Sequence, residues 1–414
     1  MTLVKTSLLN GIAVIIKMLT LLGINKILAV YVGPSGYAAL GQFQNAVQMI
    51  TTFASGAINT GVTKYTAEFY ADESRQIKVW KTAGTIVLMS SFAVSLLVAL
   101  FNRELAVWFL KNESYGGVFL WFSAALVMFV SNALLLAILN GKKEIGRYVI
   151  ANILGSVFAL GITFWLTSIW GLYGALVALG VFQSATFLVT IFLFRSASWF
   201  KFSYLIGQVD KEVAKKLGKY SLMALTSAVC VPLSQIAIRN NLAEAVGWVG
   251  AGYWEAMTRL SAAYLMLITT TLSVYYLPRL SELQLQKEVR REILQGYKII
   301  LPIAVIFSLI IYTLRDWIIG TLFTQDFLPM RNLFAWQLVG DTLKIGSWIM
   351  SFLMLSKAMF KSFIATEIVF SLSFVLLSMG FVSRFGLDGV VIAYAINYLA
   401  YWICVTFLIS SKIR

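Results

Sequence analysis

The sequence contains no histidine, only two cysteines and little charge. Without histidine, metal sites of the His/Cys type and Ser-His catalysis are excluded. No Gly-rich phosphate loop of the Walker form occurs either, which argues against ATP hydrolysis by this chain. Cys230 and Cys404 each lie inside an apolar run, where cysteine behaves as a small hydrophobic residue. The sequence therefore indicates neither a disulfide framework nor a metal or other cofactor.

The remaining composition is that of a membrane protein. Of 414 residues, 59% are hydrophobic and 12% are charged, and the mean hydropathy is +0.82, a balance foreign to a soluble domain of this size. The net charge of +15 comes from short Lys and Arg clusters between apolar runs, which favours membrane topology over nucleic-acid binding. Because Lys5 leads into a long apolar stretch without a small-residue cleavage site, we expect a retained first helix.

Twelve windows of mostly apolar residues have the length of about 20 residues that a helix needs to cross a bilayer. We therefore predict an all-α polytopic membrane protein with six spans in residues 1–200 and six in 201–414. The longest connections, 195–216 and 277–298, are rich in Lys, Arg and Glu and are expected to hold short interfacial helices. The predicted spans are 8–31, 37–60, 80–101, 117–139, 148–168, 173–194, 217–238, 252–276, 299–319, 331–356, 362–382 and 389–409.

The distribution of basic residues predicts the orientation. With twelve spans, both termini share one side of the membrane, and 23 of the 33 Lys and Arg residues fall in segments on that side. The opposite side holds six, and four lie within spans. By the positive-inside rule both termini face the cytoplasm, and the predicted location is the bacterial inner membrane.

The two halves of the sequence match each other at a shift of 214 or 215 residues. Gly171-Leu172-Tyr173-Gly174 corresponds to Gly386-Leu387-Asp388-Gly389, and Val32-Gly33 corresponds to Val246-Gly247. An internal duplication explains matches at nearly one offset. Since each half has an even number of spans, the halves share orientation and are predicted to enclose a central cavity.

Polar residues recur inside several spans, where a charged side chain costs about 2.5–3.5 kcal/mol on insertion scales. Each of these series follows one helical face. Glu255 with Arg259, and Asp341 with Lys344, are either structural ion pairs or functional groups of the cavity. The series are Gln337, Asp341, Lys344, Ser347 and Ser351; Gln42, Asn45, Gln48, Thr52, Ser55 and Asn59; Glu255 and Arg259; and Ser227, Gln235 and Arg239.

The basic residues within or near spans predict an anionic substrate. Lys17 and Lys26 have no acidic residue within the first six spans and lie about half a turn out of phase, so one faces the cavity, for which we favour Lys17, and the other can extend toward the interface. Lysine and arginine donors match phosphate oxygens, which makes a diphosphate a natural ligand. The neutral amides would suit a sugar chain, and Trp254, Trp336 and Tyr65 could stack on its rings. The predicted substrate-binding residues are Lys17, Lys26, Lys64, Arg239, Arg259, Lys344, Asn45 and Gln337.

Three stretches carry a resemblance to a known family: Asn59–Tyr65 (NTGVTKY), Ser273–Pro278 (SVYYLP) and Arg331–Asp341 (RNLFAWQLVGD). The chain resembles, over essentially its whole length, the lipid-linked oligosaccharide flippases of the Wzx type, which serve O-antigen and enterobacterial common antigen assembly within the multidrug/oligosaccharidyl-lipid/polysaccharide (MOP) exporter superfamily. Lys64 and Asp341 are motif residues of that resemblance.

The resemblance implies two six-helix lobes in a V around a cationic cavity. It also implies export of an undecaprenyl-diphosphate-linked repeat unit from the cytoplasmic to the periplasmic leaflet, as in lipopolysaccharide biosynthesis, by alternating access. The expected partners are this glycan, membrane lipids and periplasmic-side polymerase and chain-length proteins, and nucleic acid is not among them. Asp341, Glu255 or Glu367 could carry a coupling proton.

Two other functions compete with a flippase. A cation-coupled multidrug exporter of the same fold would need buried carboxylates, usually in its first half, and spans 1 to 6 contain none. A scaffold that only organises glycan-assembly enzymes would use the polar series for helix packing. An enzyme is disfavoured because no long extramembrane loop or acidic pair is available for chemistry.

Overall fold

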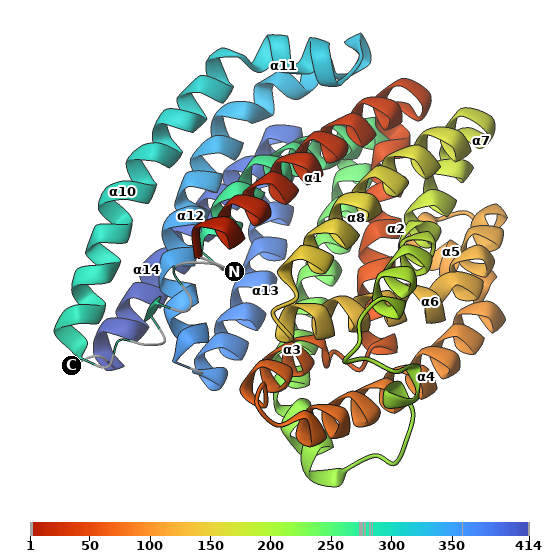
Figure 1. Ribbon diagram of the computed structural model, residues 1–414. Coiled ribbons are helices and arrows are strands. Elements are labelled where there is room, and N and C mark those ends of the chain that lie inside the picture. Colours follow the sequence, from red (N-terminus) through yellow and green to blue (C-terminus); the bar gives the residue numbers. More distant parts are fainter. Residues whose placement is uncertain are drawn as a thin grey trace. The chain divides into compact units, whose positions relative to one another are not determined.

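Helices form the architecture throughout the part of the chain that the computed structural model describes, residues 3–272, 276, 279–280, 283, 285–357 and 359–412. No strand occurs in that part, so the predicted all-α class is confirmed (Figure 1). The α-helices are α1 Leu3–Tyr31, α2 Gly33–Ala54, α3 Asn59–Glu68, α4 Glu73–Leu100, α5 Asn102–Leu110, α6 Gly116–Gly141, α7 Ile145–Arg195, α8 Lys211–Thr271, α10 Gln286–Thr313, α11 Arg315–Leu322, α12 Phe334–Ser356, α13 Phe360–Phe385 and α14 Leu387–Lys412. Short 3-10 helices are η1 Glu113–Tyr115, η2 Phe202–Leu205 and η4 Gln325–Leu333.

The helix lengths fit a multi-pass membrane protein. Within the described residues, nine helices are long and apolar enough to cross a bilayer. Two of them, α7 with 51 residues and α8 with 61, are each interrupted by one non-helical glycine, Gly171 and Gly247, and so each provides two spans. With α2, which has 22 residues but carries the polar series from Gln42 onward, the set accounts for the twelve predicted spans.

The turns at these glycines carry the signature of the duplication. Gly33 has φ of 70° and Gly247 has φ of 79°, while Gly171 (φ 54°, ψ −131°) and Gly386 (φ 56°, ψ −133°) are nearly identical. Only glycine adopts such conformations at little cost. A second glycine follows three residues after Gly171 and after Gly386. A side chain on Gly174 would collide with the backbone of Leu166, and a side chain on Gly389 would collide with the backbone of Phe381. The two halves therefore use the same backbone geometry at corresponding turns.

Several helix ends differ from their predicted positions. α2 ends at Ala54, not near residue 60, because the chain turns at Gly56 and Ala57, both with positive φ, before α3 begins. α8 continues as a helix through residue 246 to the turn at Gly247, beyond the predicted end at 238. In 277–298, residues 279 and 280 are helical and the 28-residue α10 begins at Gln286, while the expected short helix there falls partly on residues outside the described ones, 277–278, 281–282 and 284. The expected short helix in 195–216 is η2.

The described helices fall into two compact units. Unit 1 contains Met1–Ile27 and Gln42–Pro232, and unit 2 contains Leu28–Gly41 and Leu233–Arg414. This division differs from the predicted one at residue 200 in two ways: Leu28–Gly41 belongs with unit 2, and the loop after α7 and the part of α8 up to Pro232 belong with unit 1. The division of the chain into lobes 1–200 and 201–414 stays a prediction.

Unit 1 is organised around α6, which contacts α3, α4, α5 and α7. The loop after α7 is fixed to α4, because the Thr85 hydroxyl donates to the Gly207 carbonyl at 3.0 Å and the Asp210 amide donates to the Thr82 hydroxyl at 3.1 Å. Gly84 allows this approach, since a side chain there would collide with the backbone of Leu205. The segment between the predicted halves is thus packed on unit 1.

Two aspartates define helix starts outside the membrane spans. The Asp210 carboxylate accepts the backbone amides of Glu212 and Val213 at the start of α8, at 2.9 and 3.0 Å. The Val213 amide makes the largest contribution and desolvation opposes it, but with the Glu212 amide, Lys78 and Lys216 the net result is a pKa of Asp210 below its usual value. Asp72 does the same for α4, where the Ser74 hydroxyl and the Arg75 amide lower the pKa of the Asp72 carboxyl. Both residues act as helix N-caps.

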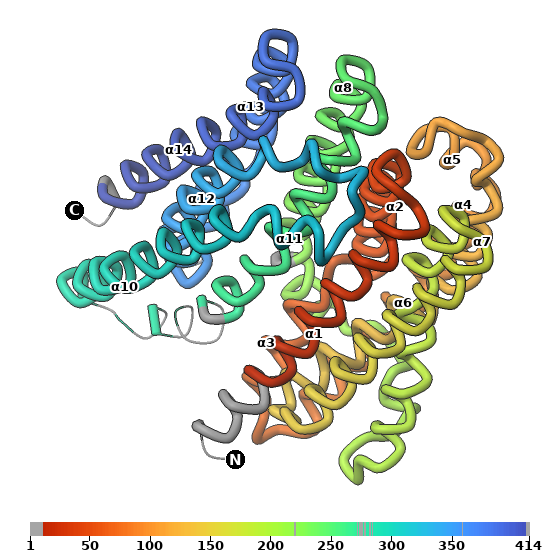
Figure 2. Tube along the Cα trace, turned by 90° about the horizontal axis from the view of Figure 1, so that it is seen from above, coloured from red at the N-terminus to blue at the C-terminus, as the bar shows by residue number. Residues whose placement is uncertain are grey.

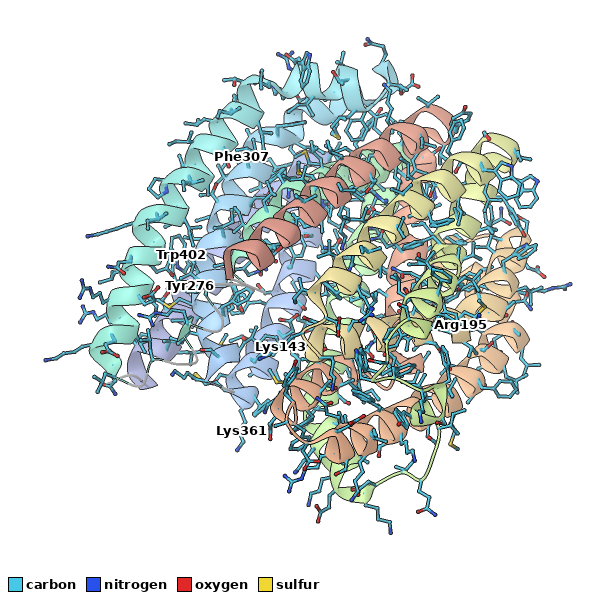
Figure 3. The ribbon with its side chains drawn as sticks, in the orientation of Figure 1. Lys143, Arg195, Tyr276, Phe307, Lys361 and Trp402 are labelled. Atoms are coloured by element: carbon cyan, nitrogen blue, oxygen red, sulfur yellow. The ribbon has the colours of Figure 1, made fainter. Side chains whose placement is uncertain are left out.

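In unit 2, α12 lies between α10 and α14, as the two views in Figures 1 and 2 agree. The core between them contains Ile349, Leu353 and Val405. Trp402 (labelled in Figure 3) donates from its indole nitrogen to the Tyr297 hydroxyl at 2.8 Å, and that hydroxyl donates to the Gly346 carbonyl at 3.0 Å. These bonds join α10, α12 and α14 into one block.

Candidate functional site

Two buried polar clusters lie along the second half of α8, residues 248–271, and both belong to unit 2. The first is an ion cluster of Arg239, Glu255 and Arg259. The Arg239 Nη2 atom lies 2.6 Å from Glu255 Oε2, and Arg259 Nε lies 2.8 Å from Glu255 Oε1. The three side chains are 2%, 6% and 8% exposed, so one carboxylate binds two guanidinium groups out of contact with solvent.

Helix geometry explains how these three residues meet. Glu255 and Arg259 are one turn apart, so they share a face of α8. Arg239 and Glu255 each lie eight residues from Gly247, and the sharp turn at that glycine folds the two parts of α8 against each other. The guanidinium of Arg239 also lies over the ring of Trp254, and that of Arg259 over the ring of Tyr37, at 5.5 and 5.8 Å.

A glycine on α2 makes room for the ion cluster. An added Cβ at Gly41 would collide with Glu255 Oε2 and would lie 2.7 Å from Arg239 Nη2. Gly41 is the last residue of the α2 segment that belongs to unit 2. The carboxylate and one guanidinium therefore lie directly against the α2 backbone.

The second cluster surrounds Asp341, whose side chain is buried with 1% exposure. Its carboxylate accepts bonds from the Ser261 hydroxyl (2.7 Å), the Tyr394 hydroxyl (2.8 Å), the Gln337 amide (3.3 Å) and the Tyr264 hydroxyl. Gly340 lets α14 approach, because a side chain there would collide with the Tyr394 ring. Neutral donors from α8, α12 and α14 thus hold the carboxylate, and it forms no ion pair with any described residue.

Lys344 lies one turn beyond Asp341 on α12 but turns toward aromatic rings. Its ammonium nitrogen lies 5.0 Å from the ring centre of Tyr398, 5.2 Å from Trp348 and 5.5 Å from Tyr394. The side chain is half-buried. Lys344 takes part in no ion pair within the described part of the chain. Three ring faces surround its ammonium, and the Asp341 carboxylate attracts it from beyond ion-pair distance.

The other predicted binding residues lie elsewhere. Lys17 is exposed on α1, Lys26 is half-buried there, and Asn45 is half-buried on α2. Lys64 is exposed on α3, with its ammonium 5.3 Å from the ring centre of Tyr65. These four residues belong to unit 1, whereas Glu367, half-buried on α13, belongs to unit 2.

The structure places five of the predicted residues in the two clusters and a sixth, Lys344, next to the second cluster. Arg239, Arg259 and Glu255 form the ion cluster, Gln337 binds Asp341, and Lys344 is one turn away. Of the SVYYLP motif, Tyr276 alone is described; its buried hydroxyl donates to the Glu292 carbonyl at 3.2 Å, and residues 273–275, 277 and 278 lie outside the described residues. Trp254 and Tyr65 are buried and Trp336 is 46% exposed.

The sequence analysis did not identify the four aromatic residues that surround Asp341 and Lys344. Tyr264, Tyr394, Tyr398 and Trp348 complete the two polar environments of α12 but contain no formal charge. A signal was present, since Tyr394 and Tyr398 are one turn apart on a helix facing the Asp341 series. In the described part of the chain, no group of three His, Cys, Asp or Glu side chains is arranged to hold a metal.

Unit 1 holds a separate cluster at the turn between α6 and α7. The Lys142 ammonium donates to the Gln76 side-chain carbonyl at 2.7 Å and lies over the rings of Tyr70, Trp80 and Trp199. The Trp199 indole donates to Glu144 at 3.0 Å. Lys142 is thus bound within unit 1 and joins α4 to the loop after α7. The neighbouring Lys143 is labelled in Figure 3.

Comparisons with known proteins agree with this architecture. Residues 3–284 match the family model described as polysaccharide biosynthesis protein. The chain is 29% identical to proteins named lipid III flippase from Escherichia coli (strain K12) and Shigella flexneri, over the full length of both chains.

Among solved structures, the chain is similar to an inward-facing multidrug resistance MATE family transporter of the MOP superfamily. The TM-score is 0.79 at 16% identity, over 96% of this chain and 94% of the other. A MOP superfamily transporter from Pyrococcus furiosus gives a TM-score of 0.65 at 16% identity, over 97% and 96%. At such identities the likeness shows the fold, which is the two-lobe helical fold of these transporters.

Proposed function

Because the chain belongs to the polysaccharide biosynthesis protein family, we propose that it is a flippase that moves a lipid-linked oligosaccharide from the cytoplasmic to the periplasmic leaflet. The full-length relatives named lipid III flippase support this assignment. The chain is a transporter and not an enzyme. The finer proposal is an undecaprenyl-diphosphate-linked repeat unit, of O-antigen or a related glycan, carried by alternating access.

The observation that carries the proposal is the position of Lys344. Its ammonium lies within a bundle of apolar helices, over three aromatic rings, without an ion pair among the described residues. A charge within a bilayer costs about 2.5–3.5 kcal/mol on insertion scales and marks a functional group by default. An ammonium held over ring faces can move to a stronger anionic partner, and a diphosphate is such a partner.

The ion cluster has a different role in the proposal. Both oxygens of Glu255 are bound by guanidinium groups, which holds this carboxylate in one position. Two guanidiniums and one carboxylate make the cluster formally positive, which favours an approaching anion over a cation. We assign Arg239 and Arg259 to this electrostatic attraction and Glu255 to their positioning.

Asp341 is then the candidate for coupling to a proton. Four donors from three helices surround it. When its carboxylate takes up a proton, at least one donor must turn away, and the change reaches α8 through Tyr264 or α14 through Tyr394. Glu367 is the alternative coupling residue in unit 2. Lys17, Lys26, Lys64, Asn45 and Gln337 stay proposed contacts to the substrate.

The proposed setting is the bacterial inner membrane with both termini in the cytoplasm. The excess of basic residues in the segments that share a side with the termini supports this orientation. Periplasmic-side polymerase and chain-length proteins are proposed partners, because they would consume the translocated glycan.

The test is accumulation of lipid-linked glycan in the cytoplasmic leaflet of cells lacking the chain. Wild type should clear the intermediate, Lys344→Arg should clear it at least in part, and Lys344→Glu should fail at equal membrane level. The arginine variant is the matched control because it retains a cation that can bind phosphate.

The competing exporter makes the opposite prediction. If no glycan intermediate accumulates and deletion instead sensitises cells to cationic drugs, the flippase assignment is wrong and a multidrug exporter of this fold takes its place.

A further inference from the structure

The three aromatic rings around Lys344 differ in how deeply they are buried. Tyr394 is buried, and its hydroxyl is bound to Asp341 at 2.8 Å, so it is a fixed part of the carboxylate cluster. Trp348 and Tyr398 are half-buried. These two rings, one on α12 and one on α14, are therefore the members that a ligand beside Lys344 could still contact.

The spacing of the residues brings two pairs face to face. Lys344 and Trp348 are one turn apart on α12, and Tyr394 and Tyr398 are one turn apart on α14, the helix that packs along α12. The Tyr394 and Tyr398 rings meet edge to face with centres 4.8 Å apart. This contact, with a second edge-to-face contact to Tyr401 at 6.3 Å, orients the Tyr398 ring.

A ring face attracts positive charge because the π-system is negative above its plane. The ammonium of Lys344 now occupies this position for all three rings. Once an anion draws the ammonium away, the faces are left for another group with positive outer hydrogens. The C–H edges of a sugar ring are such a group, and they stack on aromatic faces for the same electrostatic reason.

We propose that Trp348 and Tyr398 form a stacking site for the sugar joined directly to the diphosphate. The inference rests on the proposed function and adds the residues that recognise the glycan. In the empty protein Lys344 covers the ring faces. In the loaded protein Lys344 binds the diphosphate, and the first sugar takes its place over Trp348 and Tyr398. Because this sugar is bonded to the phosphate, an ammonium that starts about 5 Å from the ring centres needs only a short movement to bind the diphosphate while the sugar lies over the rings.

The test separates the sugar from the phosphate by using two ligands. One is undecaprenyl diphosphate without sugar, and the other is the same lipid carrying the glycan, extracted from producing cells that lack the chain. The full chain is placed in lipid nanodiscs, and the dissociation constants of both lipids are measured for wild type, Trp348→Leu, Tyr398→Leu and Lys344→Gln. Trp348→Phe and Tyr398→Phe are the matched controls because each keeps a ring.

We expect Trp348→Leu and Tyr398→Leu each to weaken binding of the glycan-bearing lipid by about 3- to 10-fold, the range of one aromatic stacking contact. The same variants should bind the sugar-free lipid like wild type. The phenylalanine variants should retain most of the affinity for the glycan-bearing lipid. Lys344→Gln should weaken binding of both lipids.

Two results would overturn the stacking site. If the leucine variants weaken binding of both lipids equally, the rings only hold Lys344. If they weaken neither while remaining folded by thermal unfolding, no sugar rests on them. Failure of wild type to bind either lipid would be a different result, because it would refute the proposed function itself.

Discussion

Replacing Gly41 with alanine is expected to separate Glu255 from the arginines that it binds. The new methyl group would occupy the position of the Glu255 carboxylate and lie 2.7 Å from Arg239 Nη2. Both side chains are almost fully buried, so neither can move out of the way into solvent. The perturbation is one methyl group, placed where α2 touches the ion cluster.

The magnitude follows from three opposing effects. Overpacking a buried site typically costs about 1–3 kcal/mol, and a buried ion pair that loses one partner costs about 3–5 kcal/mol. Alanine gains about 1 kcal/mol over glycine in helix propensity. After the gain in helix propensity, overpacking alone leaves a loss of up to about 2 kcal/mol, and separation of an arginine from the carboxylate, which we expect for Gly41→Ala, gives a loss of about 2–4 kcal/mol.

A second substitution makes the test specific. Glu255→Asp shortens the side chain by one methylene and withdraws the carboxylate from the position that the methyl group of Gly41→Ala would take. Each single variant should lower the apparent melting temperature in detergent and slow glycan clearance in cells. The double variant should recover part of both losses, which is a favourable coupling in a double-mutant cycle.

Gly161→Ala on α7 is the matched control. Gly161 is also a helical glycine, but nothing lies within 4 Å of an added Cβ, so this variant should melt at least as high as wild type. The reasoning would be refuted if Gly41→Ala behaved like Gly161→Ala, or if the double variant lost as much as both single variants together.

Three further predictions follow from the turns, the carboxylate cluster and the helix caps. Gly386→Ala should lower the apparent melting temperature, because the backbone conformation there suits only glycine and strains alanine by about 1–3 kcal/mol. Gly380→Ala has open space around its Cβ and should not lower it. Equal melting temperatures for the two variants would contradict this prediction. Tyr394→Phe should slow transport by removing one bond to Asp341, worth about 1.5–3 kcal/mol for a charged acceptor, and Asp341→Asn should slow it further; unchanged clearance by Asp341→Asn would exclude coupling there. The pKa of Asp210 is lowered in the folded chain, with the Val213 amide as the largest cause. Its carboxylate therefore stabilises the fold above the unfolded pKa of about 4 and loses that effect as the pH falls through the folded value. The difference in melting temperature between wild type and Asp210→Asn should be greatest near neutral pH and should disappear in acid.

The sequence predicted the helical class and the spans because apolar length alone decides which segments can cross a bilayer. It also located the polar faces, since periodicity places Glu255 with Arg259 and Gln337 with Asp341 on common faces. The contact of Arg239 with Glu255 could have been predicted from a turn at Gly247, because such a turn brings together residues that are equally far from Gly247 along the chain. The loop assigned to residues 239–251 concealed this symmetry.

The arrangement around Lys344 was not predictable from charge patterns. Asp341 lies within one turn of Lys344, and spacing alone favours an ion pair between them. The structure instead gives the carboxylate four neutral donors and gives the ammonium three rings. Whether Asp341 binds Lys344 or neutral donors depends on which helix packs against α12. Gly340 allows Tyr394 of α14 to approach Asp341, and this tertiary contact cannot be read from spacing along α12.

The glycine turns have a practical consequence for mapping which side of the membrane each turn faces. At Gly33, Gly171, Gly247 and Gly386 one helix passes into the next with almost no intervening backbone, so a tag or a protease has little chain to act on. Of the turns on the predicted periplasmic side, the segments around η1 and η4 offer several residues outside long helices. The chain has only two native cysteines, both in helices, so a cysteine-free background needs only two substitutions. In that background, a single cysteine placed at Ser114 or at Gln325 would show with a membrane-impermeant reagent which side of the membrane the turn faces.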